Sequence, residues 1–318
     1  MPEPARTADT VTVTVNRARH RLCAPVSIAG FLHSAGYSAD AVSVSVRGRI
    51  VRRADWHDYA LTEGLELCAI SLKPGAVQSR TPDPWQLGEH ELESRLMFAI
   101  PENADLTYLA AVTQASGIQS ATIKASPETP DVLRDVVDLL LDQGVRILPH
   151  TSGCQDARAA VVAARHGGDI VGARWVQLIV TADDAPDAGG LIAAAEQLVE
   201  DGFHVYPRIL ADPDVAADLV AIGCAGLVLE GSPSGSGRGI TDLDRFAAVL
   251  NRVEVPVILG AGTGTAAHAC QAMEMGCAAV ASTVVFRAPD QAGAAVALAH
   301  AIAAGRAAYL AQQQRRRP

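Results

Sequence analysis

The chain has 318 residues, of which 49% are hydrophobic and 19% charged, and its formal net charge is −9 at pH 7. This is enough material for one large domain and a small one, and the acidic balance argues against nucleic-acid binding despite the arginines at 315–317. No uninterrupted apolar run of about 18 residues, export-signal pattern or CxxC pair occurs, so we expect a cytoplasmic protein without membrane partner, disulfide or metal site.

The first part of the chain predicts a short tail at 1–10 and a small α+β domain at 11–75. Its patterns predict, in chain order, a strand at 11–15, a turn at 16–19 and a second strand, a helix at 26–35, and strands at 42–46, 50–51 and 65–72. This order is that of a β-grasp, ubiquitin-like module. The stretch from Lys73 to Pro84 is rich in proline and polar residues, and we assign residues 76–94 to a linker.

From residue 95 to 312, short apolar runs alternate with helix-like stretches eight times. Strands are predicted near 96–100, 119–124, 145–149, 174–180, 204–208, 225–230, 255–260 and 278–283. Helical spacing is clear at 131–141, and the Asp212-Pro213 pair is typical of a helix start. The pattern predicts an α/β fold, a (β/α)8 TIM-type barrel, with a tail at 313–318. An open doubly wound sheet is the alternative that the same alternation allows.

Several ordered motifs of the barrel resemble the bacterial thiazole synthase family, which builds the thiazole phosphate of thiamine. They occupy residues 148–154, 175–178, 201–207, 223–226, 231–237, 255–264 and 272–279. The module at 11–75 resembles the family's small sulfur-carrier protein, here fused ahead of the barrel. The resemblance implies a reaction that joins 1-deoxy-xylulose 5-phosphate, dehydroglycine and a carrier thiocarboxylate, and barrels that assemble as dimers or tetramers. It implies no cofactor.

The resemblance also implies three catalytic side chains that this sequence lacks. The family's strand-four lysine, which forms an imine with the ketose, corresponds to Gln177; its glutamate corresponds to Ile179 and its strand-seven aspartate to Gly260. An amide cannot form an imine, because the attack needs an amine with a free lone pair. The carrier's Gly-Gly terminus falls at Gly75-Ala76 inside the chain, so without proteolysis no carboxylate is available there to become a thiocarboxylate.

Two glycine-rich loops, at 231–239 and 260–264, follow the sixth and seventh strands. Such loops let backbone N–H groups approach an anion, although glycine-rich turns also occur in barrels that bind no phosphate. With the family context they predict a phosphate site. The residues expected to bind phosphate are Gly235, Gly237, Gly262, Gly264, Ser282 and Thr283.

Ionisable residues at predicted strand ends are the candidates for catalysis, because barrel sites lie on that face. Lys124, one of two lysines in the chain, alternates with Thr122 and is either a replacement nucleophile or a lysine that reaches solvent.

Three further candidates are ionisable residues at other strand ends. Glu230 is a candidate acid or base, or an ion-pair partner of Arg208, which is also placed to clamp an anionic substrate. His150, at the end of the third strand, and Glu102, after the first strand, complete the set, and a lone histidine at a strand end is more often structural than catalytic.

The sequence therefore favours a diverged thiazole-synthase-like enzyme, of transferase or lyase type, that binds a phosphorylated sugar or ketose without a Schiff-base lysine at strand four. The alternative is a non-catalytic pseudoenzyme or scaffold, inhibited by its carrier-like domain or partnered through it, in cis or in trans. A second alternative is thiazole phosphate synthesis by another route. Homo-oligomerisation is expected only from the resemblance.

Overall fold

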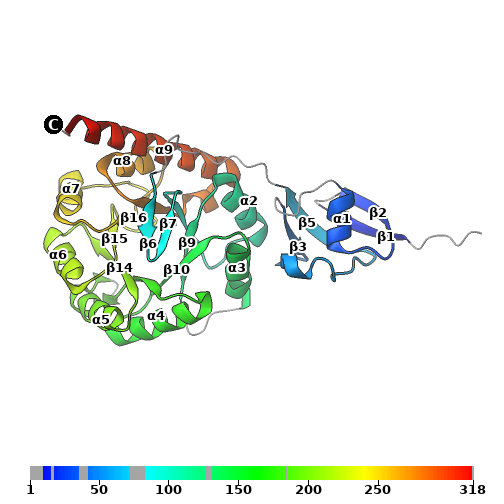
Figure 1. Ribbon diagram of the computed structural model, residues 1–318, viewed down its shortest axis with the longest axis horizontal. Helices are drawn as coiled ribbons and strands as arrows, with labels where there is room; N and C mark the ends of the chain where they lie inside the picture. The colour runs from blue at the N-terminus through cyan, green and yellow to red at the C-terminus, as the bar shows by residue number, and fades with distance from the viewer. Residues whose placement is uncertain are drawn as a thin grey trace, which may run out of the picture.

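Eight parallel strands close into a barrel in the computed structural model, which describes residues 10–15, 18–35, 42–71, 83–125, 131–182 and 185–316 (Figure 1). The strands are β8 (Leu96–Ala99), β9 (Ser120–Lys124), β10 (Arg146–His150), β11 (Trp175–Leu178), β14 (His204–Leu210), β15 (Leu227–Glu230), β16 (Val257–Ala261) and β17 (Ala279–Ser282). The TIM-type barrel is thus confirmed, and the open doubly wound sheet is excluded by the pairing of β17 with β8.

Helices surround the barrel, and most begin and end at residues that the sequence marks. They are α2 (Leu106–Ser116), α3 (Asp131–Asp142), α4 (Ala157–Val171), α5 (Ala188–Glu200), α6 (Pro213–Ile222), α7 (Leu243–Arg252), α8 (Ala266–Met275) and α9 (Gln291–Arg316). Aspartates cap the N-termini of α2, α4, α5, α6 and α7 by accepting backbone N–H bonds. Left-handed glycines end α2, α4, α6 and α8.

The inside of the barrel is filled by side chains, so the mouth at the strand C-termini is the place for a site. Met97, Leu148, Tyr206, Val228 and Ile258 are almost fully buried there. A second, larger apolar layer lies between the strands and the helices.

A hairpin closes the other end of the barrel, where the sequence predicted only linker. Its strands are β6 (Trp85–Leu87) and β7 (His90–Leu92), which pair antiparallel and lie across the centre of the barrel in Figure 1. The backbone N–H of Gly88 donates to the Tyr206 hydroxyl at 2.6 Å, and Trp85 and Leu87 are buried. A strand of three residues is too short to show an alternating pattern in the sequence. Such a short hairpin is stable only because it packs against the end of the barrel.

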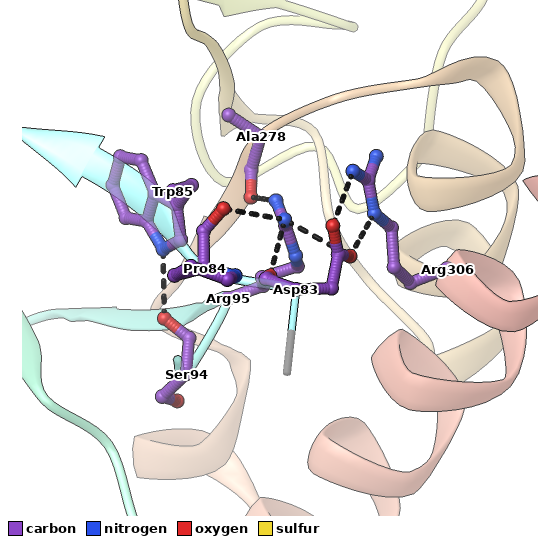
Figure 2. A network of polar contacts seen from close by, with 7 residues as sticks. All are labelled: Asp83, Pro84, Trp85, Ser94, Arg95, Ala278 and Arg306. Atoms are coloured by element: carbon purple, nitrogen blue, oxygen red, sulfur yellow. Dashed lines mark hydrogen bonds and ion pairs between the residues drawn. The ribbon is translucent and has the colours of Figure 1, made fainter. Parts of the chain in front are cut away.

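A polar network fastens the start of this hairpin to the barrel (Figure 2). Arg95, with only 6% of its side chain exposed, donates to the carbonyl oxygens of Ala278 at 2.6 Å and Asp83 at 2.7 Å. The Asp83 carboxylate also accepts from Arg306 of α9. Burial, followed by the positive charge of Arg306, lowers the pKa of Arg95 to about 10. Although burial opposes its ionisation, the two arginines hold the pKa of Asp83 below its usual value.

The N-terminal part forms a separate small α+β region with its own apolar core. Its sheet has the order β2-β1-β5-β3-β4, and its elements are β1 (Thr10–Val15), β2 (Ala18–Cys23), α1 (Ile28–Ser34), β3 (Val42–Val46), β4 (Arg49–Ile50), a 3-10 turn η2 (Arg53–Asp55) and β5 (Glu66–Ser71). This matches the predicted element order. The proposed carrier terminus at Gly75-Ala76 lies outside the described residues.

The small region lies beside α2 and α3, on the outside of the barrel (Figure 1). Arg52 pairs with Asp138 of α3 at 2.8 Å, and the Gln143 amide donates to the Ser43 hydroxyl at 3.0 Å. Asp138 lies in the second half of α3, and Gln143 follows the end of that helix. The contact is therefore on the half of the wall that is away from the mouth, because barrel helices run back toward the strand N-termini.

Helix α9 is longer than the sequence predicted. It continues to Arg316, through most of the tail expected at 313–318. By length and composition, its Gln291–Gln313 stretch is the single helix in the described ranges that could cross a membrane. It packs against α2 and α8 and buries Ala295, Leu298 and Ile302 on that side.

Candidate active site

A cavity of about 570 Å³ opens at the C-terminal ends of the barrel strands. The strand order places β10 and β11 on the opposite side of the ring from β16 and β17. The cavity therefore has two facing walls. One is made by the glycine-rich loops after β15 and β16 and the turn after β17, and we call it the loop wall. The other carries His150 and Gln177, with Arg208 of the neighbouring strand β14 at its edge next to the loop wall, and we call it the strand wall.

The two glycine-rich loops of the loop wall are packed against each other. The Gly239 N–H donates to the Gly262 carbonyl at 2.7 Å. Gly262 has φ +98°, and a Cβ there would lie 2.5 Å from the Ser232 hydroxyl oxygen; a Cβ on Gly264 would run into the backbone of Gly237. Only glycine allows this approach, which holds both loops in one shape. The expected phosphate-binding glycines are thus brought together at one wall.

Several donors of the loop wall have no partner among the described residues. The N–H groups of Gly235, Gly237 and Gly262 make no hydrogen bond there. The Thr263 hydroxyl is fully buried and also lacks a partner. The free glycine N–H groups can therefore bind an acceptor in the cavity, and the buried Thr263 hydroxyl, whose missing partner costs about 1 to 3 kcal/mol, joins them if ligand binding exposes it.

Arg287 adds a positive charge to the loop wall. It comes from the 3-10 turn η3 (Val284–Arg287), and a Cβ built on Gly235 would lie 3.6 Å from its Nη2 atom. Arg287 lines the cavity and has no ion-pair or hydrogen-bond partner in the described ranges. The sequence interpretation missed Arg287 and Thr263. Thr263 lies within the glycine-rich loop at 260–264, which the sequence analysis singled out. No sequence pattern indicates that the Arg287 side chain lies near the glycine-rich loops.

Other expected phosphate donors are already used within the protein. The Ser282 hydroxyl accepts from the Val284 N–H at 3.2 Å, and the Gly264 N–H donates to Nδ1 of His268 at 3.2 Å. Ser282 and Thr283 line the cavity, but the segment that follows them is a four-residue 3-10 turn and not a full helix. The loop wall therefore depends on its glycine N–H groups, Thr263 and Arg287.

Gln177 lies at the centre of the strand wall. Its side chain is 6% exposed and lines the cavity, and its amide has no hydrogen-bond partner among the described residues. Ile179 lines the cavity as well, and at Gly260 the space for a side chain is filled by Val228. The resemblance implies catalytic groups at these three positions. The groups that line the cavity there are instead the Gln177 amide, the Ile179 alkyl chain and the Gly260 backbone.

His150 lies next to Gln177 on the strand wall. The two residues are register partners of β10 and β11, and the His150 Nδ1 atom accepts from the Ser152 N–H at 3.4 Å. The pKa of His150 is lowered to about 4, mainly by burial and also by the charges of Arg208 and Lys124, while the charge of Glu102 opposes the shift. His150 is therefore neutral near pH 7. With Nδ1 accepting, the proton is on Nε2, which makes this ring a hydrogen-bond donor toward a ligand.

The half-buried His150 makes the folding stability depend on pH. Its pKa in the folded chain, about 4, is below its ordinary value of 6.5, so the unfolded chain binds the proton more tightly. Between these two pH values we expect acid to remove stability on the order of 3 kcal/mol. The measurement is chemical unfolding at pH 7.5, 6, 5 and 4. In the control His150→Gln, the free energy of unfolding should change less between pH 6.5 and pH 4 than it does in the unaltered chain. An equal change in both proteins would contradict the lowered pKa of His150.

Arg208 and Glu230 form an ion pair, one of the two alternatives that the sequence left open. The Arg208 Nε and Nη2 atoms lie 2.7 and 2.6 Å from Glu230 Oε1, and Nη2 also donates to the Ser234 hydroxyl at 2.6 Å. Arg208 lines the mouth cavity. Glu230 lines a neighbouring cavity of about 470 Å³, which Arg208 also borders.

Lys124 does not line the mouth cavity. Its Nζ atom pairs with Glu102 Oε1 at 2.8 Å, and the two side chains are 39% and 68% exposed. Lys124 lines a separate groove beside Gly153 and Cys154. Its positive charge still contributes to the lowered pKa of His150. Within the described ranges no three His, Cys, Asp or Glu residues gather as metal ligands.

Comparisons with known proteins match the barrel. The family described as thiazole biosynthesis protein ThiG matches residues 86–318. Thiazole synthases of Vibrio parahaemolyticus and Vibrio atlanticus are 37% identical over 231 residues and 36% identical over 234, and each match covers 71% of this chain and 91% of the relative.

Solved structures give the same result. A chain of the Amycolatopsis orientalis BexX/CysO complex has a TM-score of 0.66 and 30% identity, covering 72% of this chain and 96% of that one. The 3-hexulose-6-phosphate synthase of Salmonella typhimurium, with a TM-score of 0.51 and 16% identity over 65% of this chain and 98% of that one, shares the fold.

Proposed function

The chain belongs to the ThiG thiazole biosynthesis family, and from this membership we propose that its barrel binds a phosphorylated sugar or ketose and acts on it without a strand-four imine. The observation that carries the proposal is the pair of facing walls in the mouth cavity. The loop wall supplies free backbone donors, the Thr263 hydroxyl and Arg287, which suit a phosphate group. The strand wall supplies Gln177 and His150 for the rest of the ligand.

The side chains of the cavity limit the chemistry. Its lining residues include arginines, hydroxyls, one amide and a neutral imidazole, and they include no lysine, carboxylate or thiol. In this proposal His150 Nε2–H and the Gln177 amide hydrogen-bond a sugar oxygen and stabilise negative charge that develops on it. Glu230 is held against Arg208, and Lys124 lies in the adjoining groove, so both act from outside the cavity. An enzyme of transferase or lyase type remains the proposed class.

The phosphate requirement tests the proposal. We expect calorimetric titration to give at least about tenfold tighter binding of xylulose 5-phosphate than of xylulose, because only the phosphate meets the loop wall. In Arg287→Met this difference should fall to a few-fold. The matched control is Arg238→Met, an exposed arginine of the same loop that does not line the cavity. Equal binding of both sugars by the unaltered protein would overturn the proposal.

The alternative is a non-catalytic scaffold that works through its carrier-like region. The similar Amycolatopsis orientalis structure is a complex of BexX with CysO, which supports contact between such a barrel and a second protein. In this chain, however, the small region contacts α3 on the outer wall, which favours neither a plug in the mouth nor autoinhibition in cis. Turnover of any phosphorylated sugar by the isolated chain would exclude the scaffold.

Thiazole phosphate synthesis is the second alternative, and family membership is what favours it. It would have to proceed without an amine in the cavity. A cytoplasmic location and a homo-oligomeric state are further parts of the proposal, which rest on the same membership. Size-exclusion chromatography with light scattering tests the oligomeric state directly.

A further inference from the structure

The strand wall of the mouth cavity presents hydrogen-bond donors from three side chains. His150 offers Nε2–H, since its Nδ1 atom already accepts from Ser152. Gln177 offers its amide, which is nine-tenths buried and has no partner among the described residues. Arg208 also lines the cavity and offers Nη1, because its bonds to other described residues use only Nε and Nη2. Apart from the Gln177 carbonyl, these groups cannot accept a hydrogen bond.

Arg208 is fixed in place before any ligand arrives. Glu230 Oε1 accepts from two of its nitrogens, and the Ser234 hydroxyl accepts from one of them. Glu230 offsets the charge of Arg208 but leaves the Nη1 edge open. A guanidinium held in this way loses little rotamer freedom on binding, and its two remaining N–H groups, both on Nη1, form stronger hydrogen bonds with a charged carboxylate oxygen than with a hydroxyl or a carbonyl.

A carboxylate also fits the number of donors better than other sugar groups do. A hydroxyl needs an acceptor for its own proton, and a carbonyl oxygen accepts about two bonds, whereas a carboxylate accepts about four. The strand wall offers three donating side chains that line the cavity. The loop wall, which faces His150 and Gln177 and meets Arg208 at Ser234, holds the phosphate in the proposed function.

From these facing walls we propose that the ligand of the mouth cavity is a phosphorylated sugar acid, with its phosphate at the loop wall and its carboxylate against Arg208, Gln177 and His150. The cavity of about 570 Å³ is within the range of small-molecule sites. This inference rests on the proposed function, because it needs the phosphate end to be bound as described. It adds a substrate class and makes Arg208 the residue that determines it.

The test compares three compounds by calorimetry at pH 7.5: 6-phosphogluconate, glucitol 6-phosphate and gluconate. The unaltered chain should bind 6-phosphogluconate at least about tenfold more tightly than glucitol 6-phosphate, which has a hydroxyl in place of the carboxylate. Equal binding of the two phosphates would overturn the inference and leave the proposed function standing. If neither phosphate binds, the inference is also overturned, and the proposed function fails with it only if xylulose 5-phosphate does not bind either.

Variants assign the effect to Arg208. The double variant R208M/E230Q removes the guanidinium without leaving Glu230 as an unpaired buried carboxylate, and it should lose the tenfold preference while it still requires phosphate. Glu230→Gln alone leaves the Arg208 charge uncompensated and should increase the preference. In Arg287→Met the binding of 6-phosphogluconate and of glucitol 6-phosphate should weaken by the same factor. The preference for 6-phosphogluconate should therefore stay unchanged. A preference that survives in a folded R208M/E230Q protein would contradict the role of Arg208.

Discussion

Replacing Gln177 by lysine is expected to turn a protein that forms no reducible adduct in its mouth cavity into one that does. Gln177 is nine-tenths buried beside Arg208, and an amine there would have a lowered pKa and a free lone pair near pH 8. With a ketose phosphate and borohydride, intact-protein mass spectrometry should show one covalent adduct per chain in Gln177→Lys. The unaltered protein should show none at that site.

Lys124 is the control for this experiment, since it is the one lysine among the described residues. Any weak labelling of the unaltered chain at Lys124 should disappear in Lys124→Ala, and the adduct of Q177K/K124A should stay. If the unaltered chain gives a stoichiometric adduct that Lys124→Ala removes, then Lys124 is the nucleophile. In that case the cavity as described does not contain the reacting group.

Replacing Arg95 by methionine is expected to give the largest loss of stability of any substitution proposed here. The change removes a buried guanidinium that bonds Ala278 and Asp83, and it leaves their oxygens without a donor on the barrel floor (Figure 2). Breaking a buried charged pair in this way costs about 3 to 5 kcal/mol. Urea unfolding followed by circular dichroism measures the loss. The hairpin should also become more accessible to proteases.

The matched control is Arg165→Met, which breaks a pair of similar length on the barrel exterior. Arg165 Nη2 lies 2.7 Å from Asp201 Oδ2, and the two side chains are 48% and 31% exposed. Exposed pairs contribute about 0 to 1 kcal/mol, so this variant should unfold almost as the unaltered chain does. Equal losses in the two variants would show that the Arg95 network does not fasten the barrel floor.

The barrel was predictable because its strands and helices carry strong local signals. The β8 strand is a mostly buried apolar run, and the Asp212-Pro213 pair starts α6 as the sequence indicated. The β6 and β7 hairpin was not predictable, since its order depends on Tyr206 and Trp175 of distant strands. The end of α9 was misplaced for a similar reason: polar glutamines continue a helix that tertiary packing stabilises.

The candidate site was predicted in part. His150, Gln177, Arg208 and the loop glycines were expected on one face, and they do line one cavity. Side-chain direction is what the pattern could not give. Lys124 lies outside the cavity and pairs with Glu102. A charged amine is more stable in contact with water and a carboxylate than when it is buried against the cavity wall.

The most direct test of the account is a crystal structure of the chain grown with a ketose phosphate. The account predicts the phosphate about 3 Å from the N–H groups of Gly235 and Gly262 and from Arg287. It also predicts the sugar carbonyl beside Gln177 and His150, with no covalent bond to the protein. A phosphate in another groove, or density joining the sugar to Lys124, would contradict it.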